Sequence, residues 1–560
     1  MANQRHDAGD GPPRLRQRAW WLVAASLIAA FLARGPLYLS VFPPFEGWDE
    51  YQHLAYIVHL DETGTIPTYD SRVPLALRPL AIAMPHSPGG GQQLSDWGVL
   101  SYADYWNPPA PTAGTDREAS ASPRLYQSQH PPLAYVLAVP IWRALKTDRP
   151  LEAIYLLRTM NLLLVAAALV LFAGALTRLV PALAPRVAVF ALVCLHPLFF
   201  QNTARVANDA LAIATALAGI SVLVLADGRT LLTRGLLSAG CIAASLWTKQ
   251  TSLTVIPALV LGLPLIGWAH GATAGRLWRV TSIATGVFLL LVTPVWLWNY
   301  QHYGGSVTTQ DSLELAARGS VVSTLARSVA HVPWKFLVEA FFVPGMPWIG
   351  GWSFVPMQEM LAGLYGWCFR FLLAAAAAGA IVAMLRRVRS VERASVLRTE
   401  GGAAAGLAVC ATVVIFTVLG MAYHSVLSYA VFGQVGTTPW YFMTALPFLF
   451  VLLVRGLEAI DRRLATAAAA ALAVLFVAID LHGTWVQMPR FYASTSDAAL
   501  QWSRLTAIHP AILSGRQRWL FLAIQLGALC LVVGALVYAW RSSRNRGAAG
   551  GFQGSGFAPQ

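Results

Sequence analysis

The chain has 560 residues, of which 40 are Lys or Arg and 26 are Asp or Glu, so its formal net charge at pH 7 is +14. Only 12% of the residues are charged and 56% are hydrophobic, whereas a soluble domain has about 25% charged residues. This composition excludes a cytosolic enzyme, a secreted disulfide scaffold and a disordered polymer. The basic residues form short clusters between apolar runs, with no stripe interleaved with aromatics, so they do not indicate nucleic-acid binding.

The apolar runs predict about twelve transmembrane helices, because roughly 20 helical residues cross the hydrocarbon core of a bilayer. In chain order the expected helices lie near 20–42, 154–177, 187–203, 208–226, 233–248, 252–269, 280–299, 363–385, 402–423, 438–455, 464–482 and 517–540. An even number of spans places both termini on one side. The expected fold is therefore an all-α polytopic membrane protein with interfacial helices in long outer loops.

Arginine-rich short loops set the expected orientation, because positively charged loops stay in the cytoplasm. One set of connections and both ends of the chain are basic, whereas the opposite short loops hold little beyond Arg205 and Lys249. We therefore expect a multi-pass protein of the cell (inner or cytoplasmic) membrane with both termini cytoplasmic. Its expected parts are a basic N-terminus (1–18), a membrane domain (19–540) with outer loops at 43–151, 300–360 and 483–516, and a disordered tail (541–560).

The first outer loop opens with Pro43-Pro44-Phe45-Glu46-Gly47-Trp48-Asp49-Glu50-Tyr51-Gln52-His53. The prolines end the first helix, and the apolar positions of 50–60 predict a short helix on the membrane surface, ended at Gly64. Asp49 and His53 would share one face of this helix. Asp49 followed by Gln52 equally fits a helix cap, in which the carboxylate accepts backbone N–H bonds. Both interpretations stand, because a cap can also hold a catalytic carboxylate in place.

A second motif in this loop is Tyr126-Gln127-Ser128-Gln129-His130-Pro131-Pro132. The apolar run that follows it, 136–145, is too short to span a membrane. Residues 84–123, between the two motifs, are rich in Pro, Gly and Ser, which predicts a mobile loop that can serve as a lid.

Together these features resemble the GT-C superfamily of membrane glycosyltransferases. An acidic pair follows the first span, an H-P-P-L segment precedes the second, and N-D-A-L-A opens a later helix. The likeness is to the protein O-mannosyltransferase and aminoarabinose-transferase branch and to related uncharacterised bacterial membrane proteins. These share a P-P-x-x-G-x-D-E-x-x-H signature, which here comprises Pro43, Pro44, Gly47, Asp49, Glu50 and His53.

The resemblance implies a reaction and roles for particular residues. In GT-C enzymes an acidic residue of the first outer loop serves the acceptor or the sugar, and the donor is a sugar on a polyprenyl phosphate or diphosphate. Asp49 is then the expected catalytic carboxylate and Glu50 its neighbour or substitute. Trp48 and Tyr51-Gln52 depart from the residues expected around this pair, which leaves the donor sugar open. The chemistry agrees, because such a transfer needs a base for the acceptor and cationic partners for the departing phosphate.

Basic residues near the outer face are candidate phosphate ligands. Lys249 interrupts an apolar stretch, where an unpaired lysine is costly, although it could also be a snorkelling topology residue. Arg158 begins the second span on this face. Arg205 precedes Asp209 by four residues, so the two form either a structural ion pair or a phosphate ligand with a second acid at the sugar. Lys335, beside a predicted interfacial helix in the second outer loop, either meets the donor or lies in a helix that only packs on lipid.

We expect the remaining substrate contacts from His53, Tyr126 and His130. No cofactor is expected, although His53 and a neighbouring carboxylate have a spacing that could hold a divalent metal. Arg34, inside the first span, should face the protein interior and pair with an acid of the first loop. Trp440-Tyr441 are interfacial anchors or, as the weaker reading, substrate contacts.

The expected function is transfer of a hexosyl or pentosyl group from a polyprenyl-phosphate donor to an extracytoplasmic glycan, lipid or protein. A transporter or flippase of the same lipid-linked sugar is the alternative, because about twelve spans also suit transporters. Against it, the two halves of the chain look unlike and the inner loops hold no nucleotide-binding pattern. A glycan polymerase or ligase is a third alternative, for which the dominant outer loop should lie later in the chain.

Overall fold

The computed structural model describes residues 13–108, 122–305, 309–317, 321–335, 350–351, 353–389, 397–436, 439–509 and 514–550. Within these ranges the chain is helical or irregular, and its only extended pairings are two isolated bridges, Arg72 with Arg124 and His86 with Ser101. The predicted all-α membrane architecture is confirmed.

Among the described residues, eight helical segments are long and apolar enough to cross a membrane, and a bent pair makes a ninth. The eight lie in α1 (Pro13–Leu39), α7 (Pro150–Leu179), α12 (Ile256–Ala269, with the 3-10 turn Gln250–Val255), α13 (Ala274–Tyr303), α17 (Glu359–Arg389), α18 (Leu397–Phe432), α20 (Arg462–His482, continuing into α21, Met488–Tyr492) and α23 (Gly515–Gly550). The bent pair is α8 (Leu183–Leu195) and α9 (Pro197–Thr203), which meet at 51°.

Three further helices that the sequence predicts to span are short: α10 (Asp209–Val224), α11 (Leu231–Leu246) and α19 (Leu446–Ile460), of 16, 16 and 15 residues. At about 1.5 Å per residue they are shorter than the hydrocarbon core, so the count of twelve stays a prediction. The expected span 187–203 is broken before Pro197, because proline disfavours helical backbone in the residue before it. The expected boundary at 423 is wrong, since α18 continues to Phe432 and α19 begins only at Leu446.

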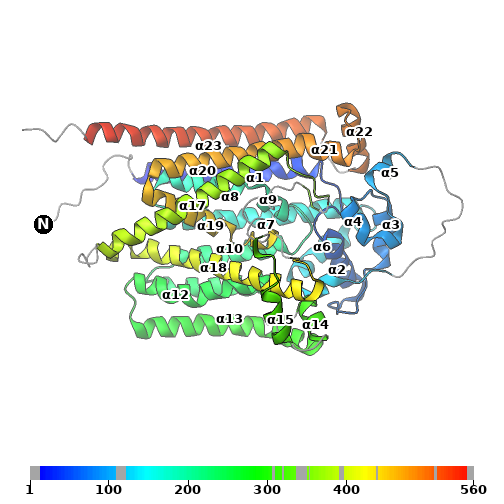
Figure 1. Ribbon diagram of the computed structural model, residues 1–560, viewed down its shortest axis with the longest axis horizontal. Helices are drawn as coiled ribbons and strands as arrows, with labels where there is room; N and C mark the ends of the chain where they lie inside the picture. The colour runs from blue at the N-terminus through cyan, green and yellow to red at the C-terminus, as the bar shows by residue number, and fades with distance from the viewer. Residues whose placement is uncertain are drawn as a thin grey trace, which may run out of the picture.

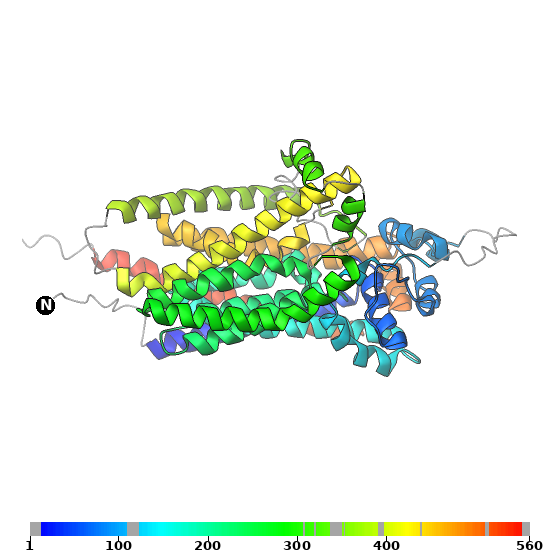
Figure 2. The same cartoon turned by 90° about the horizontal axis from the view of Figure 1, so that it is seen from below.

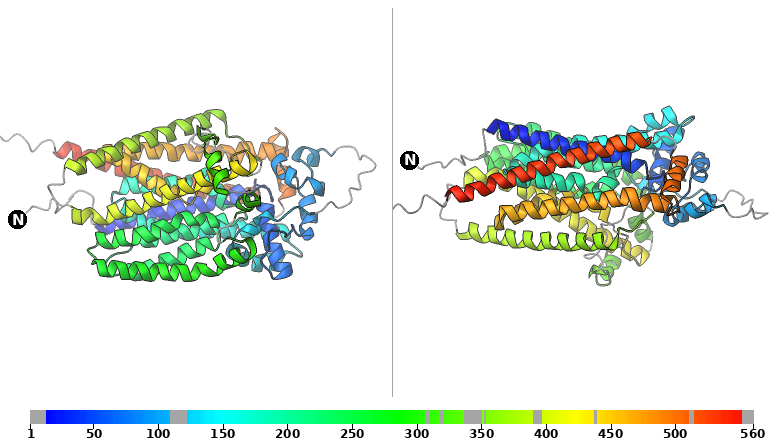
Figure 3. Two further views of the ribbon diagram at one scale, coloured as in Figure 1. Left: turned by 60° about the horizontal axis from the view of Figure 1, so that its bottom comes forward. Right: turned by 90° about the horizontal axis from the view of Figure 1, so that it is seen from above.

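The long helices run side by side in one bundle (Figures 1 and 2). α1 begins and α23 ends at the same end of this bundle (Figure 3). The opposite end carries helices of the first and third expected outer loops. These are α2 (Glu50–Thr63), α3 (Arg78–Ile82), α4 (Pro88–Gln93), α5 (Tyr102–Trp106), α6 (Leu133–Leu145) and α22 (Ala498–Ile508). α14 (Gln310–Ala317) and α15 (Val321–Val329) belong to the second.

The first outer loop is more ordered than its composition predicts. α2 does not lie on a lipid surface, because all its residues from Glu50 to Val58 are buried under protein, with α6 packed against it. It ends at Gly64, whose φ of 67° confirms the expected stop. The segment 84–108 of the predicted mobile tract folds into α4, a 3-10 turn and α5; 109–121 lies outside the described residues.

The C-terminal helix is longer than the sequence predicts. α23 continues to Gly550, beyond the predicted helix end at 540 and into the expected tail. Residues 1–12 and 551–560 lie outside the described ranges.

Arg34 faces the protein interior, as predicted, but its partner is not an acid of the first loop. Its guanidinium binds Asp480 of α20 at 2.9 and 2.7 Å and the Cys194 carbonyl at 3.0 Å, and it lies 4.1 Å from the centroid of the Phe200 ring. This buried pair ties α1 to α20 and to the helix break after α8.

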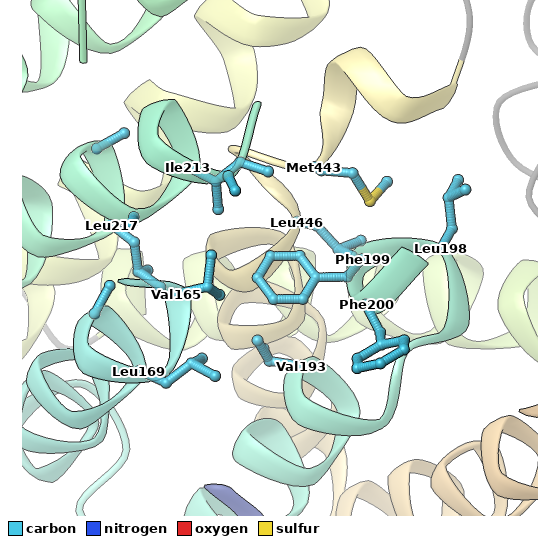
Figure 4. Close-up of a cluster of buried hydrophobic side chains, with 14 of the residues drawn as sticks. Val165, Leu169, Val193, Leu198, Phe199, Phe200, Ile213, Leu217, Met443 and Leu446 are labelled. Atoms are coloured by element: carbon cyan, nitrogen blue, oxygen red, sulfur yellow. The ribbon is translucent and has the colours of Figure 1, made fainter. Parts of the chain in front are cut away.

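A cluster of buried apolar side chains joins several helices of the bundle (Figure 4). They come from α7, α8, α9, α10, the start of α19 and the segment just before it, and include Val165, Leu169, Val193, Leu198, Phe199, Phe200, Ile213, Leu217, Met443 and Leu446. Phe200 also packs edge-on against Phe31 of α1. Packing of this kind fixes the backbone on which the polar cluster stands.

Candidate active site

Asp49 sits between α1 and α2 with left-handed backbone angles, φ 58° and ψ 14°. Its side chain makes no capping hydrogen bond to the helix, so the capping interpretation is wrong. Asp49 instead accepts hydrogen bonds from the Tyr126 hydroxyl and, at 3.1 Å, from Gln127 Nε2. Gln52, the other half of the expected cap, donates to Tyr51 and to the Arg124 carbonyl, both at 2.9 Å. Tyr126 and Gln127 of the second motif therefore hold the carboxylate of Asp49 in the first motif.

The adjacent acid, Glu50, points elsewhere. Its carboxylate forms a bidentate pair with Arg158 at 2.7 and 2.5 Å and accepts the Val206 N–H at 2.8 Å. Arg158 also donates hydrogen bonds to the carbonyls of Phe42 and Pro43. Glu50 and Arg158 are thus fully buried and bonded to each other and to the backbone. This arrangement locks the entry of the first outer loop onto α7.

Gly47, the glycine of the signature around Asp49, lies where two loops pack closely. A Cβ atom on Gly47 would lie 3.0 Å from Cβ of Arg205 and 3.1 Å from Cβ of Glu50. A larger residue would push apart the loop that carries Asp49 and the loop that carries Arg205.

Arg205, Asp209 and Lys249 form a buried ion cluster. Asp209 binds Lys249 Nζ at 2.6 Å with one oxygen and Arg205 Nη2 at 2.8 Å with the other. Arg205 also donates to Asn202 Oδ1 at 2.6 Å and to the carbonyl of Trp48. The predicted ion pair between Arg205 and Asp209 is confirmed, whereas the role of Asp209 as a second acid at the sugar stays a prediction. Two cations share one carboxylate, so the cluster carries a formal charge of +1, which favours an anionic ligand.

These groups form one constellation, which we call the Asp49 site: Asp49, His53, Tyr126, His130, Arg205, Asp209 and Lys249. Burial raises the pKa of Asp49, while its hydrogen bond from Tyr126 and the charges of Arg205 and Lys249 oppose that rise. Burial and the Lys249 charge lower the pKa of His130 to about 3, so this imidazole is neutral. Asp49, Tyr126 and His130 are only half-buried as residues, so this part of the site is not sealed within the protein.

Several buried polar atoms of this region have no hydrogen-bond partner among the described residues. They are Trp48 Nε1, Gln127 Oε1, His130 Nδ1, Asn202 Nδ2, Arg205 Nε and Asn208 Oδ1. Native proteins leave few buried polar atoms unpaired. Their concentration beside Asp49 gives the site unmet hydrogen-bonding capacity that a polar ligand or bound water can fill.

A small cleft of about 20 Å³ lies beside His53, between α2, α6, α7 and α10. His53 accepts or donates a 2.9 Å hydrogen bond with the Tyr135 hydroxyl at this cleft. The remaining lining is largely apolar and includes Leu137, Met160 and Leu164. Leu137 is exposed, so an apolar surface lies next to one residue of the Asp49 site.

Glu46, three residues before Asp49, is fully buried. Its Oε1 accepts the Ser87 N–H at 2.8 Å, and its Oε2 has no partner among the described residues. Burial raises the pKa of Glu46 to about 7, and the Ser87 hydrogen bonds oppose that rise. The outer loops pack closely here, because a Cβ on Gly351 would lie 2.0 Å from the Glu46 carbonyl oxygen.

The structure brings nine of the ten predicted site residues together or into direct support of the Asp49 site. Lys335 is exposed after α15 and is not part of the contacts described above. Within the described ranges, no three His, Cys, Asp or Glu side chains are grouped as metal ligands would be. Independence from metal therefore stays a prediction.

Sequence reasoning did not select Gln127, although it follows Tyr126 directly in the second motif. It also did not select Asp480, although an acid inside an apolar stretch is as costly as Arg34 and signals a buried pair.

No protein-family model and no curated protein sequence matches the chain. Among solved structures, the apo oligosaccharyltransferase of Archaeoglobus fulgidus aligns over 86% of this chain and 59% of its own, with 13% identity and a TM-score of 0.46. ArnT from Cupriavidus metallidurans, bound to undecaprenyl phosphate, aligns over 95% of this chain and 78% of its own, with 13% identity and a TM-score of 0.39.

The oligosaccharyltransferase AglB of Archaeoglobus fulgidus, in complex with an inhibitory peptide and a dolichol-phosphate, aligns over 87% of this chain. It has 11% identity and a TM-score of 0.42, and the chain spans only 56% of its length.

Proposed function

We propose that this protein transfers a sugar from a polyprenyl-phosphate donor to a hydroxyl acceptor on the outer side of the cytoplasmic membrane. The observation that carries the proposal is a half-buried carboxylate, Asp49, within reach of the charges of a buried cluster of net positive charge, Arg205–Asp209–Lys249. A base and an anion site side by side are what such a transfer requires. The short sequence motifs point to the same chemistry.

In the proposed reaction the acceptor oxygen attacks the anomeric carbon of the donor sugar. Asp49 takes the hydroxyl proton as the C–O bond forms. The bond between the anomeric carbon and the phosphate oxygen breaks, and its electron pair leaves with the polyprenyl phosphate. A glycosyl phosphodiester carries one negative charge, which matches the +1 of the ion cluster, and the departing phosphate gains a second.

The remaining residues position these groups. Tyr126 and Gln127 donate to Asp49 and fix its carboxylate. Glu50 and Arg158 act as positioning residues, because their hydrogen bonds are used within the protein. The small cleft beside His53 is lined largely by apolar side chains, which suits contact with an isoprenoid chain.

The position of the termini supports the proposed orientation. α1 begins and α23 ends at the end of the bundle opposite to the Asp49 site (Figure 1). With the arginine-rich ends of the chain in the cytoplasm, the site faces outward.

The test is complementation of a strain that lacks this chain by the wild type or by Asp49→Asn. We expect the deletion to accumulate a glycosyl polyprenyl phosphate and to lose one envelope sugar by mass spectrometry. The wild type should reverse both changes, and Asp49→Asn, expressed at the same level, should reverse neither. If Asp49→Asn reversed both changes, Asp49 would not be the catalytic base. Donor trapped on the cytoplasmic leaflet of the deletion strain would instead identify a flippase.

A further inference from the structure

Two aromatic residues from the segment before α19 lie beside the Asp49 site. The Trp440 ring stacks on that of Trp48, the residue before Asp49, with centroids 4.4 Å apart and planes 26° apart. Tyr441 follows, with its ring centroid 6.1 Å from that of Trp440. We call Trp440 and Tyr441 the aromatic shelf.

The aromatic shelf is joined to the ion cluster at its other end. Lys249 Nζ lies 5.3 Å from the centroid of the Tyr441 ring while it binds Asp209 at 2.6 Å. Asp209 binds Arg205, which in turn donates to the carbonyl of Trp48. The contacts therefore close a ring, with aromatic faces on one side and the two cations on the other, next to Asp49.

The shelf differs from an ordinary interfacial anchor in its burial. Trp48 is 1% exposed, whereas Trp440 and Tyr441 are half-buried. Trp48 covers part of the Trp440 indole, and the half-buried state of Trp440 leaves another part of the residue accessible. An anchor needs only a lipid boundary, but this indole stacks on a buried tryptophan whose carbonyl accepts a hydrogen bond from the ion cluster.

A sugar ring has the chemistry to use such a surface. Aromatic faces carry negative charge density, and one face of a pyranose presents several C–H groups of slight positive charge. Binding sites for small polar ligands combine aromatic walls with a few fixed polar groups, and the unpaired atoms beside Asp49 supply those groups. Lys249, the proposed phosphate ligand, lies 5.3 Å from the centroid of the Tyr441 ring, so a sugar attached to that phosphate is within reach of the shelf.

We propose that the aromatic shelf binds the pyranosyl ring of the donor, with Trp440 stacked against its C–H face and the anomeric carbon held between Asp49 and the two cations. This assignment rests on the proposed glycosyl transfer and makes Trp440 a residue that selects for the sugar rather than for the lipid.

The test measures affinity of the purified, detergent-solubilised full chain for undecaprenyl phosphate and for its glucosyl, mannosyl and xylosyl derivatives. We expect the wild type to bind at least one glycosyl lipid about tenfold more tightly than the bare phosphate, the size of one good aromatic contact. Trp440→Leu should lose this preference and keep its affinity for bare undecaprenyl phosphate within about twofold.

Three further variants make the result specific. Trp440→Phe should keep most of the preference, because a flat ring remains. Trp440→Met is the second disruptive variant, measured alongside Trp440→Leu so that a folding failure of one leaves the other. Trp278→Leu removes an equally large but exposed indole at the start of α13 and should change nothing. Thermal unfolding of every variant reports folding.

Equal loss of affinity for bare and glycosyl lipids in the folded variants would overturn the shelf, as would an unchanged preference. A wild type that binds undecaprenyl phosphate but prefers none of the sugars would overturn the shelf alone. A wild type that binds none of the four lipids would overturn the proposed transfer as well.

Discussion

Glu50 binds Arg158 through both carboxylate oxygens, at 2.7 and 2.5 Å, in the interior of the protein. Its chain neighbour Asp49 turns to the opposite side and meets Tyr126. The left-handed backbone of Asp49 separates the two acids. Two adjacent carboxylates of one motif therefore have different surroundings: Glu50 is fully buried in an ion pair, whereas Asp49 is half-buried and is the proposed base.

Glu50→Gln should destabilise the protein by about 3–5 kcal/mol, because it leaves the Arg158 charge buried without a counter-ion. The measurement is thermal unfolding in detergent. The double variant Glu50→Gln/Arg158→Met removes both charges and should be more stable than Glu50→Gln. A single variant as stable as the wild type would show that the pair does not support the fold.

Lys249→Met should weaken binding of undecaprenyl phosphate by about 10- to 100-fold, since hydrogen bonds to charged groups contribute about 1.5–3 kcal/mol. Binding is measured with the purified chain at fixed ionic strength. Lys146→Met, on an exposed lysine that pairs with Asp61, is the matched control and should leave affinity unchanged. Equal weakening by both variants would mean that Lys249 acts only through overall charge.

The activity should rise with pH through the raised pKa of Asp49, because the base works only when deprotonated. Lys249 lowers that pKa, so its removal should move the acidic limb of the profile to higher pH. The measurement is kcat/KM against pH for the wild type and for Lys249→Met. A limb that stays in place, or moves to lower pH, would argue against Asp49 as the titrating base.

Glu46→Gln should increase stability at neutral and alkaline pH. Burial raises the pKa of Glu46 from its ordinary 4.5 to about 7, so the native state binds its proton more tightly than the unfolded state does. The free energy of unfolding of the wild type therefore falls by about 3 kcal/mol as pH rises from 4.5 to 7 and then stays constant. The variant should lack this slope in unfolding measured from pH 4 to 8. The same pH dependence of the free energy of unfolding in both proteins would show that Glu46 does not cause it.

The long helices and the key acid could be predicted from the sequence because their signals are local. An apolar run of about 20 residues predicts a span without further context, and the motif around Asp49 is contiguous. Helix ends were less predictable, although local signals exist. α18 ends before Gly433, whose φ is 68°, and α19 has Pro447 in its first turn.

The partners of the charged residues could not be predicted, because they are distant in the chain. Arg34 was expected to meet a nearby acid, yet Asp480 lies 446 positions away. Burial of α2 likewise depends on α6 and the second motif, which turn a face expected to touch lipid into protein interior.

The positive φ of Asp49 limits which side chains this position tolerates. Asparagine and glycine adopt such angles readily, whereas glutamate and most other residues are strained there. A longer acid therefore cannot simply replace Asp49, and the peptide conformation itself sets how far the carboxylate reaches toward its target. Asparagine at this position keeps the backbone unstrained but cannot act as a base, whereas glutamate keeps a carboxylate but strains the backbone. Substitution of Asp49 therefore leads to an inert amide more readily than to a different acid.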